Sequence, residues 1–221
     1  MKYSDLTIII PTLNEAGSIG ELLRIISRSY AGARVIVADD GSTDGTRKIA
    51  AGKASLLDRS RSEVHGLTAS VLDAAAAAKT KFFVVIDGDL QHPPEKIAEI
   101  AAQLRDGKRV VIGERVNVDG NWPLNRRMMS IAATMLARLR LMRWLKDPMS
   151  GFFGAETMYF NRIAERNMKR FEHAGYKVLF DFLKCSGAAP GSVKYTFYGR
   201  KGGKSKIGMR HAALFLRSLF R

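Results

Sequence analysis

Two carboxylates separated by one glycine close an apolar segment of the chain. Residues 81–86 (KFFVVI) are followed directly by Asp87, Gly88 and Asp89. Like charges at the end of a buried strand are unfavourable, so the pair is expected to have a chemical task. Magnesium and manganese bind oxygen ligands and often bridge one or two protein carboxylates to the phosphates of a substrate. With the amide oxygen of Gln91, the pair predicts part of a divalent-metal site; the alternative is a solvated turn.

Two further polar segments follow apolar, strand-like runs. PTLNE, residues 11–15, comes after residues 6–10, and DDGSTDG, residues 39–45, comes after residues 34–38. Ligands of open α/β sheets bind beyond the carboxyl ends of the strands, so all three polar segments are expected at one edge. A carboxylate at that position, here Asp39, Asp40 or Asp44, is typical of ribose or base binding. The same letters also suit a turn that caps a helix.

The elements that must hold these segments alternate between strands and helices. Strands are predicted at residues 6–10, 34–38, 81–86, 110–113 and 192–198. Helices are predicted at residues 17–30, 66–79, 94–105, 124–146 and 207–221, with a short one after the second polar segment. Strands that are apolar throughout are buried on both faces. The sequence therefore predicts an α/β fold with a mostly parallel sheet covered by helices on both sides.

Positive charge is concentrated in the second half of the chain. Residues 1–107 hold 13 basic and 14 acidic residues, whereas residues 108–221 hold 23 and 7, within a net charge of +15. A half with a net charge of +16 suits a polyanion, such as ligand phosphates, nucleic acid or an anionic membrane, or it is a solubilising face. Arg115 follows the strand at residues 110–113, and Arg126, Arg200 and Lys206 lie in segments able to reach the same edge. Each has the alternative of a solvated surface residue, which is the preferred interpretation for Arg138, Arg140 and Arg143.

The last predicted helix and the cysteine content bear on location. Residues 207–221 read as a basic amphipathic helix suited to a membrane surface, or as a terminal helix packed on its own core. Cys185 is the single cysteine, and the chain has neither a secretory signal nor an apolar run of the roughly 18 residues that a membrane span needs. These features favour a reducing compartment, the cytoplasm.

Neither His65 nor His92 is given a catalytic role, and His92 is expected to shape the turn before Pro93.

The ordered motifs resemble family 2 glycosyltransferases with the GT-A fold, and among them the dolichyl-phosphate mannosyltransferase (polyprenyl-phosphate glycosyltransferase) group. The motifs that carry the resemblance are PTLNE, DDGSTDGT, DGDLQHPPE, IGER, NRRMMS, DPMSGFF and RKGGKSKIG. The resemblance implies one GT-A catalytic domain over residues 1–206, with a nucleotide-sugar half (1–114) and an acceptor half (115–206). It implies a membrane-interface helix at residues 207–221.

The resemblance also implies a role for each matching residue. The base and ribose would contact Pro11, Leu13, Glu15, Ala38 and Asp40. The rest of the sugar nucleotide would contact Asp87, Gly88, Asp89, Gln91, Arg115, Arg200 and Lys206. Mg²⁺ or Mn²⁺ would be held by Asp87, Asp89 and Gln91. The acceptor phosphate would contact Arg115, Arg126, Ser130 and Arg200. The residues expected to carry catalysis are Asp89, Arg115, Arg126 and Arg200.

The implied activity is inverting, metal-dependent transfer of a hexose, mannose from GDP-mannose, to a polyprenyl (dolichyl) phosphate at the cytoplasmic side of a membrane. A phosphate nucleophile is ionised near pH 7, so no strong general base is needed. One alternative uses UDP-glucose as the donor, and another uses a hydroxyl acceptor with Asp147 as the base. A third is a non-enzymatic basic module that binds nucleic acid or membranes, whereas the transferase interpretation expects no nucleic acid.

Two motifs depart from the family pattern. Processive synthases carry Q-x-x-R-W, and here Arg140 stands in place of the glutamine before Arg143 and Trp144, so processive synthesis is not expected. The glycine-rich G-L-G-x-A of the group reads GLTAS at residues 66–70, which weakens the assignment of that loop to the acceptor side.

Overall fold

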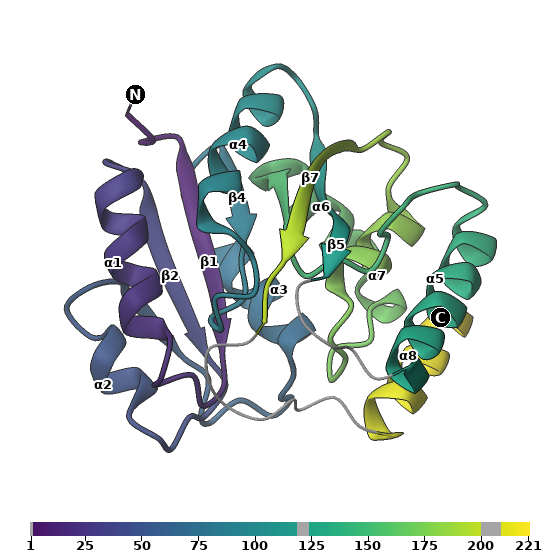
Figure 1. The fold of residues 1–221 in the computed structure, drawn as a ribbon, viewed down its shortest axis with the longest axis horizontal. Coiled ribbons are helices and arrows are strands. Elements are labelled where there is room, and N and C mark those ends of the chain that lie inside the picture. Colours follow the sequence, from purple (N-terminus) through teal and green to yellow (C-terminus); the bar gives the residue numbers. More distant parts are fainter. Residues whose placement is uncertain (1, 119–123, 200–208) are drawn as a thin grey trace.

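A seven-stranded sheet runs through the centre of the protein (Figure 1). The computed structural model describes residues 2–118, 124–199 and 209–221, and the side chains of residues 2–118, 128–199 and 212–221. The strand order is β3-β2-β1-β4-β6-β5-β7. The strands are β1 (Leu6–Thr12), β2 (Arg34–Asp39), β3 (Ser55–Asp58), β4 (Phe82–Val85), β5 (Val110–Val118), β6 (Phe153–Glu156) and β7 (Gly191–Phe197). Every neighbouring pair is parallel except the two that involve β6, which confirms a mostly parallel sheet.

The antiparallel strand β6 was not predicted from the sequence. It lies between β4 and β5, with Phe153 opposite Val85 on one side and Ile112 on the other. Its four residues include Gly154, where an added Cβ would lie 2.5 Å from Ile100 Cγ2. So short a strand, with a glycine that allows close helix packing, gives no clear alternation of apolar and polar residues. It brings the preceding DPMSGF segment to the edge where β4 ends.

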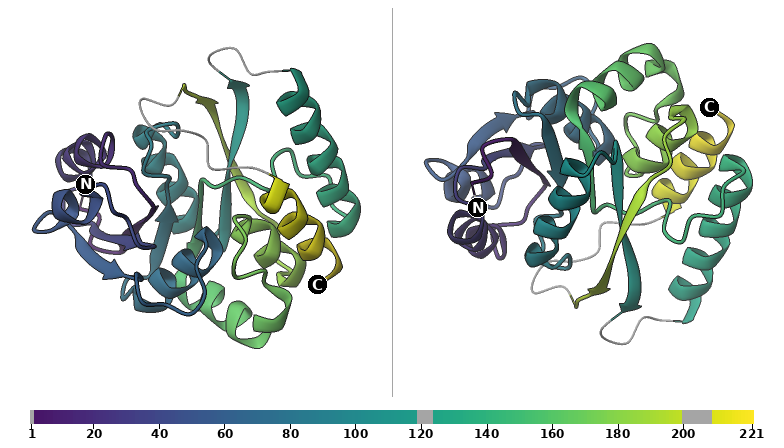
Figure 2. Two further views of the ribbon diagram at one scale, coloured as in Figure 1. Left: turned by 90° about the horizontal axis from the view of Figure 1, so that it is seen from below. Right: turned by 90° about the horizontal axis from the view of Figure 1, so that it is seen from above.

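Helices cover both faces of the sheet, as predicted (Figure 2). One face packs against α1 (Ile19–Ser29) and α4 (Ile97–Arg105). The other packs against α3 (Leu67–Ala77), α6 (Thr157–Arg166) and α7 (Val178–Cys185). The remaining helical elements are α2 (Thr46–Ala50), α5 (Leu124–Leu141), α8 (Met209–Phe220) and the 3₁₀ turns η1 (Pro94–Lys96) and η2 (Met168–Arg170).

Helices α6 and α7 were also missed, for a physical reason that is clearest in α7. Its first six residues, VLFDFL, are all buried. A helix that is buried on every side lacks the one-sided apolar pattern by which helices are recognised. Helix α5, in contrast, was predicted to continue to residue 146 and instead ends at Leu141. The next residue, Met142, has φ of 52°, a left-handed conformation that ends helices.

Helix α8 packs one side onto the domain. Phe215 and Leu219 are buried in the core, and Lys184 Nζ donates a hydrogen bond of 2.6 Å to the Ser218 carbonyl. Leu216 and Phe220 face outward, with 49% and 89% of their surface exposed. The helix thus satisfies the core-packing alternative on one side, while its membrane role and the domain limits at 206 and 207 stay predictions. None of the helices described is long and apolar enough to cross a membrane.

Candidate active site

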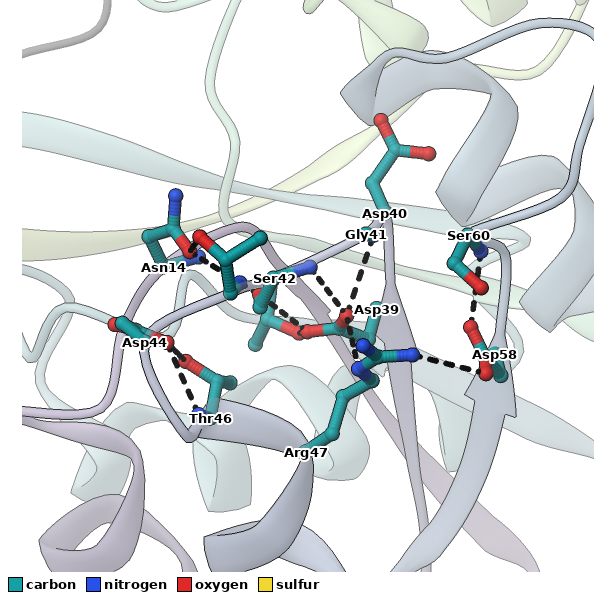
Figure 3. Close-up of polar contacts among 12 residues, drawn as sticks. Asn14, Asp39, Asp40, Gly41, Ser42, Asp44, Thr46, Arg47, Asp58 and Ser60 are labelled. Atoms are coloured by element: carbon teal, nitrogen blue, oxygen red, sulfur yellow. Dashed lines mark hydrogen bonds and ion pairs between the residues drawn. The ribbon is translucent and has the colours of Figure 1, made fainter.

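The first two polar segments meet at the carboxyl ends of β1 and β2 (Figure 3). Asn14 N donates to Ser42 Oγ over 2.8 Å, and Thr43 N donates to Asn14 Oδ1 over 2.8 Å. Glu15 N donates to Thr46 Oγ1 over 2.8 Å. These cross-links bring PTLNE against DDGSTDG, as expected for segments that follow the carboxyl ends of parallel strands.

Asp39 and Asp44 organise this junction. Asp39 is fully buried and accepts hydrogen bonds from Thr12 Oγ1 (2.9 Å), Ser42 N (2.8 Å) and Ser42 Oγ (2.5 Å). Asp44 accepts from Ala16 N and Thr46 N, each over 3.0 Å. Burial opposes the ionisation of Asp44, but the Thr46 and Ala16 hydrogen bonds outweigh it and lower its pKa. For these two residues the turn-and-cap alternative describes their contacts in the structure.

Asp40 points away from that cluster and has a second set of partners (Figure 3). One carboxylate oxygen accepts from Gly66 N over 2.8 Å, and the other pairs with Arg59 and lies 3.1 Å from His65 Nδ1. Arg59 is buried and also donates to Asp73, Ser70 and the Val64 carbonyl. Sequence reasoning missed Arg59, which directly follows β3, a strand that was not predicted. The assignment of Asp40 to the base or ribose stays a prediction.

The third polar segment lies beside the first. Gly88 packs against PTLNE, since an added Cβ would lie 3.3 Å from Thr12 Cγ2, and the Gly88 carbonyl accepts from Ser18 Oγ over 2.8 Å. Asp89 is 4% exposed, and its Oδ1 accepts from Gln91 N over 3.1 Å. All three segments predicted to share one edge therefore do so.

The residues of this turn fit a divalent cation that shares its coordination with a substrate. Asp87, Asp89 and Gln91 supply oxygen donors within one turn. Gln91 Nε2 donates to the Tyr198 carbonyl over 3.0 Å, so its other amide atom, the oxygen, is the one that a cation would meet. Within the described part of the chain, no group of three His, Cys, Asp or Glu side chains is arranged to hold a metal. Two carboxylates plus phosphate oxygens are a common magnesium environment.

His92 is buried directly behind the turn. Its ring stacks on Phe152, with centroids 5.2 Å apart, and Nδ1 accepts from Asp87 N over 3.3 Å. Burial lowers the pKa of His92 to about 4, despite the opposing charge of Asp89. The imidazole is therefore neutral at pH 7, and the absence of a catalytic role for His92 stays a prediction.

An ion pair between half-buried Arg115 and buried Asp147 forms the basic side of the site. Arg115 donates to Asp147 through Nε (2.6 Å) and Nη2 (2.9 Å). Burial by itself lowers the pKa of Arg115, but the hydrogen bonds and charge of Asp147 raise it overall. Both carboxylate oxygens of Asp147 thus accept hydrogen bonds from a permanent cation. Such a carboxylate is poorly suited to remove a proton from a hydroxyl acceptor.

Lys177 is a cation that sequence reasoning missed. It immediately precedes α7, and its Nζ donates to the Met149 carbonyl over 3.1 Å. Burial lowers its pKa to about 8; the nearby charge of Arg115 lowers it further, and Asp147 and Asp87 oppose the shift. These couplings put Lys177 among the groups of the site. Because α7 itself was not predicted, no pattern in the sequence pointed to this lysine.

Comparison with known proteins now identifies the family. Residues 7–167 match the sequence profile of Glycosyl transferase family 2. The chain belongs to this family.

Named relatives agree with this assignment, and a solved structure shares the fold. The chain is 32% identical to a dolichol-phosphate mannosyltransferase of Pyrococcus furiosus, covering 100% of this chain and 63% of that protein, and so spans less than two thirds of its length. It is 30% identical to the Saccharomyces cerevisiae protein of the same name, and the match covers 99% of this chain and 86% of that protein. The crystal structure of glucosyl-3-phosphoglycerate synthase from Mycobacterium tuberculosis with Mn²⁺ and UDP superposes with a TM-score of 0.66 at 20% identity. That match covers 97% of this chain and 77% of the other. The GT-A fold is thereby confirmed.

A hollow lies between β5 and α5. It encloses about 280 Å³ and contains Ser130 together with Arg115 and Asp147. Its other lining residues are Val118, Ile131, Thr134, Met135, Arg138 and Lys146. Of the predicted acceptor-phosphate residues, Arg115 and Ser130 therefore share one hollow.

The remaining predicted residues of the family 2 site divide into two groups. Pro11 and Ala38 pair across β1 and β2, and Leu13 and Glu15 follow at the same edge. Arg200 and Lys206 lie outside the described residues, and the side chain of Arg126 lies outside the described side chains although its helix is described.

The three arginines taken as solvated have defined partners instead. Arg138 Nε donates to the Leu145 carbonyl (2.6 Å), Arg140 Nε to the Leu219 carbonyl (2.7 Å) and Arg143 Nη1 to the Ala188 carbonyl (3.0 Å). The prediction was wrong because charge patterning alone does not reveal carbonyl groups left at helix ends and in loops. All three arginines bind backbone carbonyl groups, and Arg140 joins α5 to α8.

Proposed function

We propose that this protein transfers a hexose from a nucleotide sugar to a polyprenyl phosphate with inversion at the anomeric carbon. The observation that carries the proposal is the meeting, at one sheet edge, of an oxygen-donor turn (Asp87, Asp89, Gln91) with the cations Arg115 and Lys177. That combination suits a reaction that brings two phosphate-bearing substrates together. Relatives named dolichol-phosphate mannosyltransferase favour mannose from GDP-mannose, with UDP-glucose as the second candidate donor.

On the donor side, Asp87, Asp89 and Gln91 would hold Mg²⁺ or Mn²⁺ on the diphosphate. The ion, when bound, neutralises the charge that develops on the leaving diphosphate. Asp40 is held in place by Arg59 and Gly66 N, and its carboxylate is proposed to accept a hydrogen bond from the base or the ribose. The proposed contacts of the base and ribose with Pro11, Leu13, Glu15 and Ala38 rest on the resemblance to the family.

On the acceptor side, the phosphate oxygen attacks the anomeric carbon as the bond to the nucleoside diphosphate breaks. Arg115, Ser130 and Lys177 are the described residues proposed to position phosphates, with Arg126, Arg200 and Lys206 joining them. An ionised phosphate needs no base, and Asp147 is already committed to Arg115. The ion pair therefore supports a phosphate acceptor over a hydroxyl acceptor.

An apolar surface on α5 and α8 supports a peripheral position on a membrane. The two helices lie side by side (Figures 1 and 2), joined by the hydrogen bond from Arg140 to the Leu219 carbonyl. Large apolar side chains are exposed on both helices and directly after α5: Met135, Leu139, Leu216 and Phe220 on the helices, and Met142 and Trp144 in the segment that follows α5. Apolar exposure on this scale, within a strongly basic half, is typical of binding to an anionic lipid surface. We propose the cytoplasmic leaflet as that surface.

The test is a transfer assay with a purified donor panel. The protein is incubated with Mn²⁺, dolichyl phosphate and radiolabelled GDP-mannose or UDP-glucose, and the organic phase is counted. Label should enter the lipid fraction with one donor and require both metal and lipid phosphate. Absence of turnover and of binding across a broad panel of sugar nucleotides contradicts the proposal, and transfer that needs no lipid phosphate favours a hydroxyl acceptor.

The membrane proposal has its own matched pair of variants. Phe220→Ser removes an exposed apolar side chain and should weaken sedimentation with vesicles of mixed phosphatidylcholine and phosphatidylserine by ~3- to 10-fold, with little change in melting temperature. Leu219→Ala removes a buried neighbour on the same helix and should lower stability by about 2 kcal/mol. Equal vesicle binding by Phe220→Ser and the unmodified protein would contradict a role for this face.

A further inference from the structure

We infer that His92 is a positioning residue, whose imidazole holds the backbone of the turn at Asp87 and thereby orients the Asp87 carboxylate for the metal and diphosphate. The inference rests on the proposed function and adds a residue to which that function gives no role. His92 follows Asp87 and Asp89 in the same turn and is 2% exposed. It therefore cannot contact bulk solvent and acts through what it touches.

The first contact fixes the backbone of the turn. His92 Nδ1 accepts from Asp87 N over 3.3 Å and lies 3.5 Å from Asp87 Oδ2. An amide at a buried strand end requires an acceptor, and this one is supplied by the ring. Because Nδ1 accepts, the ring proton resides on Nε2.

The turn needs such support because its backbone is strained. Leu90, between the carboxylates and His92, has φ of 61°. This left-handed conformation is unusual for a bulky residue and persists only where surrounding contacts enforce it. Leu90 is itself 7% exposed, and the bond from Asp87 N to His92 closes the turn around it.

The second set of contacts fixes the ring. Besides the stacked Phe152, the ring meets Tyr195 and Phe197 edge-on, with centroids 5.5 Å away in each case. These rings come from the segment before β6 and from β7, so the imidazole is enclosed by residues from the second half of the chain. Gly151 closes the enclosure, since an added Cβ would lie 3.2 Å from Asp87 Oδ2 and 3.5 Å from His92 Cε1.

The consequence is that Asp87 is oriented from behind by a group that never touches the substrate. Partners that orient metal ligands typically contribute ~10- to 100-fold to metal affinity. A purely structural histidine would contribute to stability alone. The two roles separate because the ring has one polar contact with the turn and several aromatic contacts with the core.

Two variants divide these contacts. His92→Phe keeps an aromatic ring for Phe152, Tyr195 and Phe197 but removes the acceptor. His92→Asn removes the ring but keeps an acceptor oxygen close to the position of Nδ1. Binding of Mn²⁺ is measured by electron paramagnetic resonance in the presence of GDP, and separately of UDP, with thermal unfolding in parallel.

His92→Phe should bind Mn²⁺ ~10-fold or more weakly while melting close to the unmodified protein. His92→Asn should melt lower but bind Mn²⁺ within ~3-fold of the unmodified protein at a temperature where both are folded. Unchanged Mn²⁺ binding by a folded His92→Phe overturns the inference and leaves the proposed function standing. If His92→Phe does not fold, His92→Asn decides: retained affinity supports the inference and lost affinity overturns it. Failure of the unmodified protein to bind Mn²⁺ with either nucleotide overturns the inference and the metal-dependent function together.

Discussion

Two turns in this molecule carry adjacent or nearly adjacent aspartates after a parallel strand, and they are built differently. The turn after β2 is cross-linked by hydroxyl and amide groups. Asp39 accepts hydrogen bonds from Thr12 and Ser42, and Asp40 pairs with Arg59 and accepts a hydrogen bond from Gly66 N. The turn after β4 is backed by His92 and an aromatic enclosure and lies near the cations Arg115 and Lys177. Aspartates at equivalent positions after two parallel strands therefore have different roles. The first turn is mainly scaffold, and the second is proposed to bind the ion and diphosphate.

The largest expected effect separates the turns by activity. Asp89→Ala should reduce transfer at least ~100-fold, since it removes a proposed metal ligand, while the protein still folds. Steady-state transfer rates and thermal unfolding check this. Asp106→Ala, at an exposed aspartate after α4, is the control and should be unchanged in both. Near-normal turnover of Asp89→Ala would refute the metal role.

Asp39→Ala should show the opposite pattern. It leaves Thr12 Oγ1, Ser42 N and Ser42 Oγ without their buried acceptor, so the free energy of unfolding should fall by about 2–4 kcal/mol. Urea denaturation measures the loss. The folded fraction of Asp39→Ala should lose less specific activity than Asp89→Ala does. A larger loss of activity in Asp39→Ala would contradict the assignment of the first turn to the scaffold and the second to catalysis.

Much of this division was predictable, and the limits have physical causes. The apolar runs predicted parallel strands whose carboxyl ends meet at one edge of the sheet, so Asp40, Asp87 and Asp89 could be located at that edge from the sequence. It did not predict that Arg59 pairs with Asp40, because β3 is short and largely exposed. Nor did it predict Lys177, which precedes the fully buried start of α7. Long-range partners carried by elements without periodicity leave no local signal.

Arg59→Lys probes the scaffold turn more finely. Its guanidinium serves Asp40, Asp73 and Ser70 together with the Val64 carbonyl, and one ammonium group cannot reach all four. Stability should fall by about 1–3 kcal/mol, and KM for the donor should rise several-fold because Asp40 loses its orientation. Arg61→Lys, at an exposed neighbour, is the control. A KM that stays constant despite lost stability would leave Asp40 with a scaffold role alone.

The smallest effect concerns the pH response of the second turn. Lys177 has a pKa of about 8, and the charged groups coupled to it are Arg115, Asp147 and Asp87. The cationic form is the one suited to the diphosphate, so kcat/KM for the donor should decline as pH rises through about 8. Lys177→Arg keeps the charge and should move this decline to higher pH, whereas Lys169→Arg, at an exposed site, should not.

Lys177 has the opposite effect on stability, which provides an independent check. Its folded-state pKa lies below the ordinary value of 10.5, so between about 8 and 10.5 the unfolded chain binds more protons. The contribution of Lys177 to stability therefore rises with pH over the interval in which activity falls. Denaturation of the unmodified protein and Lys177→Arg at several pH values isolates this contribution by difference. If activity and stability decline together as pH rises in the unmodified protein, and Lys177→Arg changes neither decline, the pH response belongs to another group. Lys177 then has no role beside the second turn.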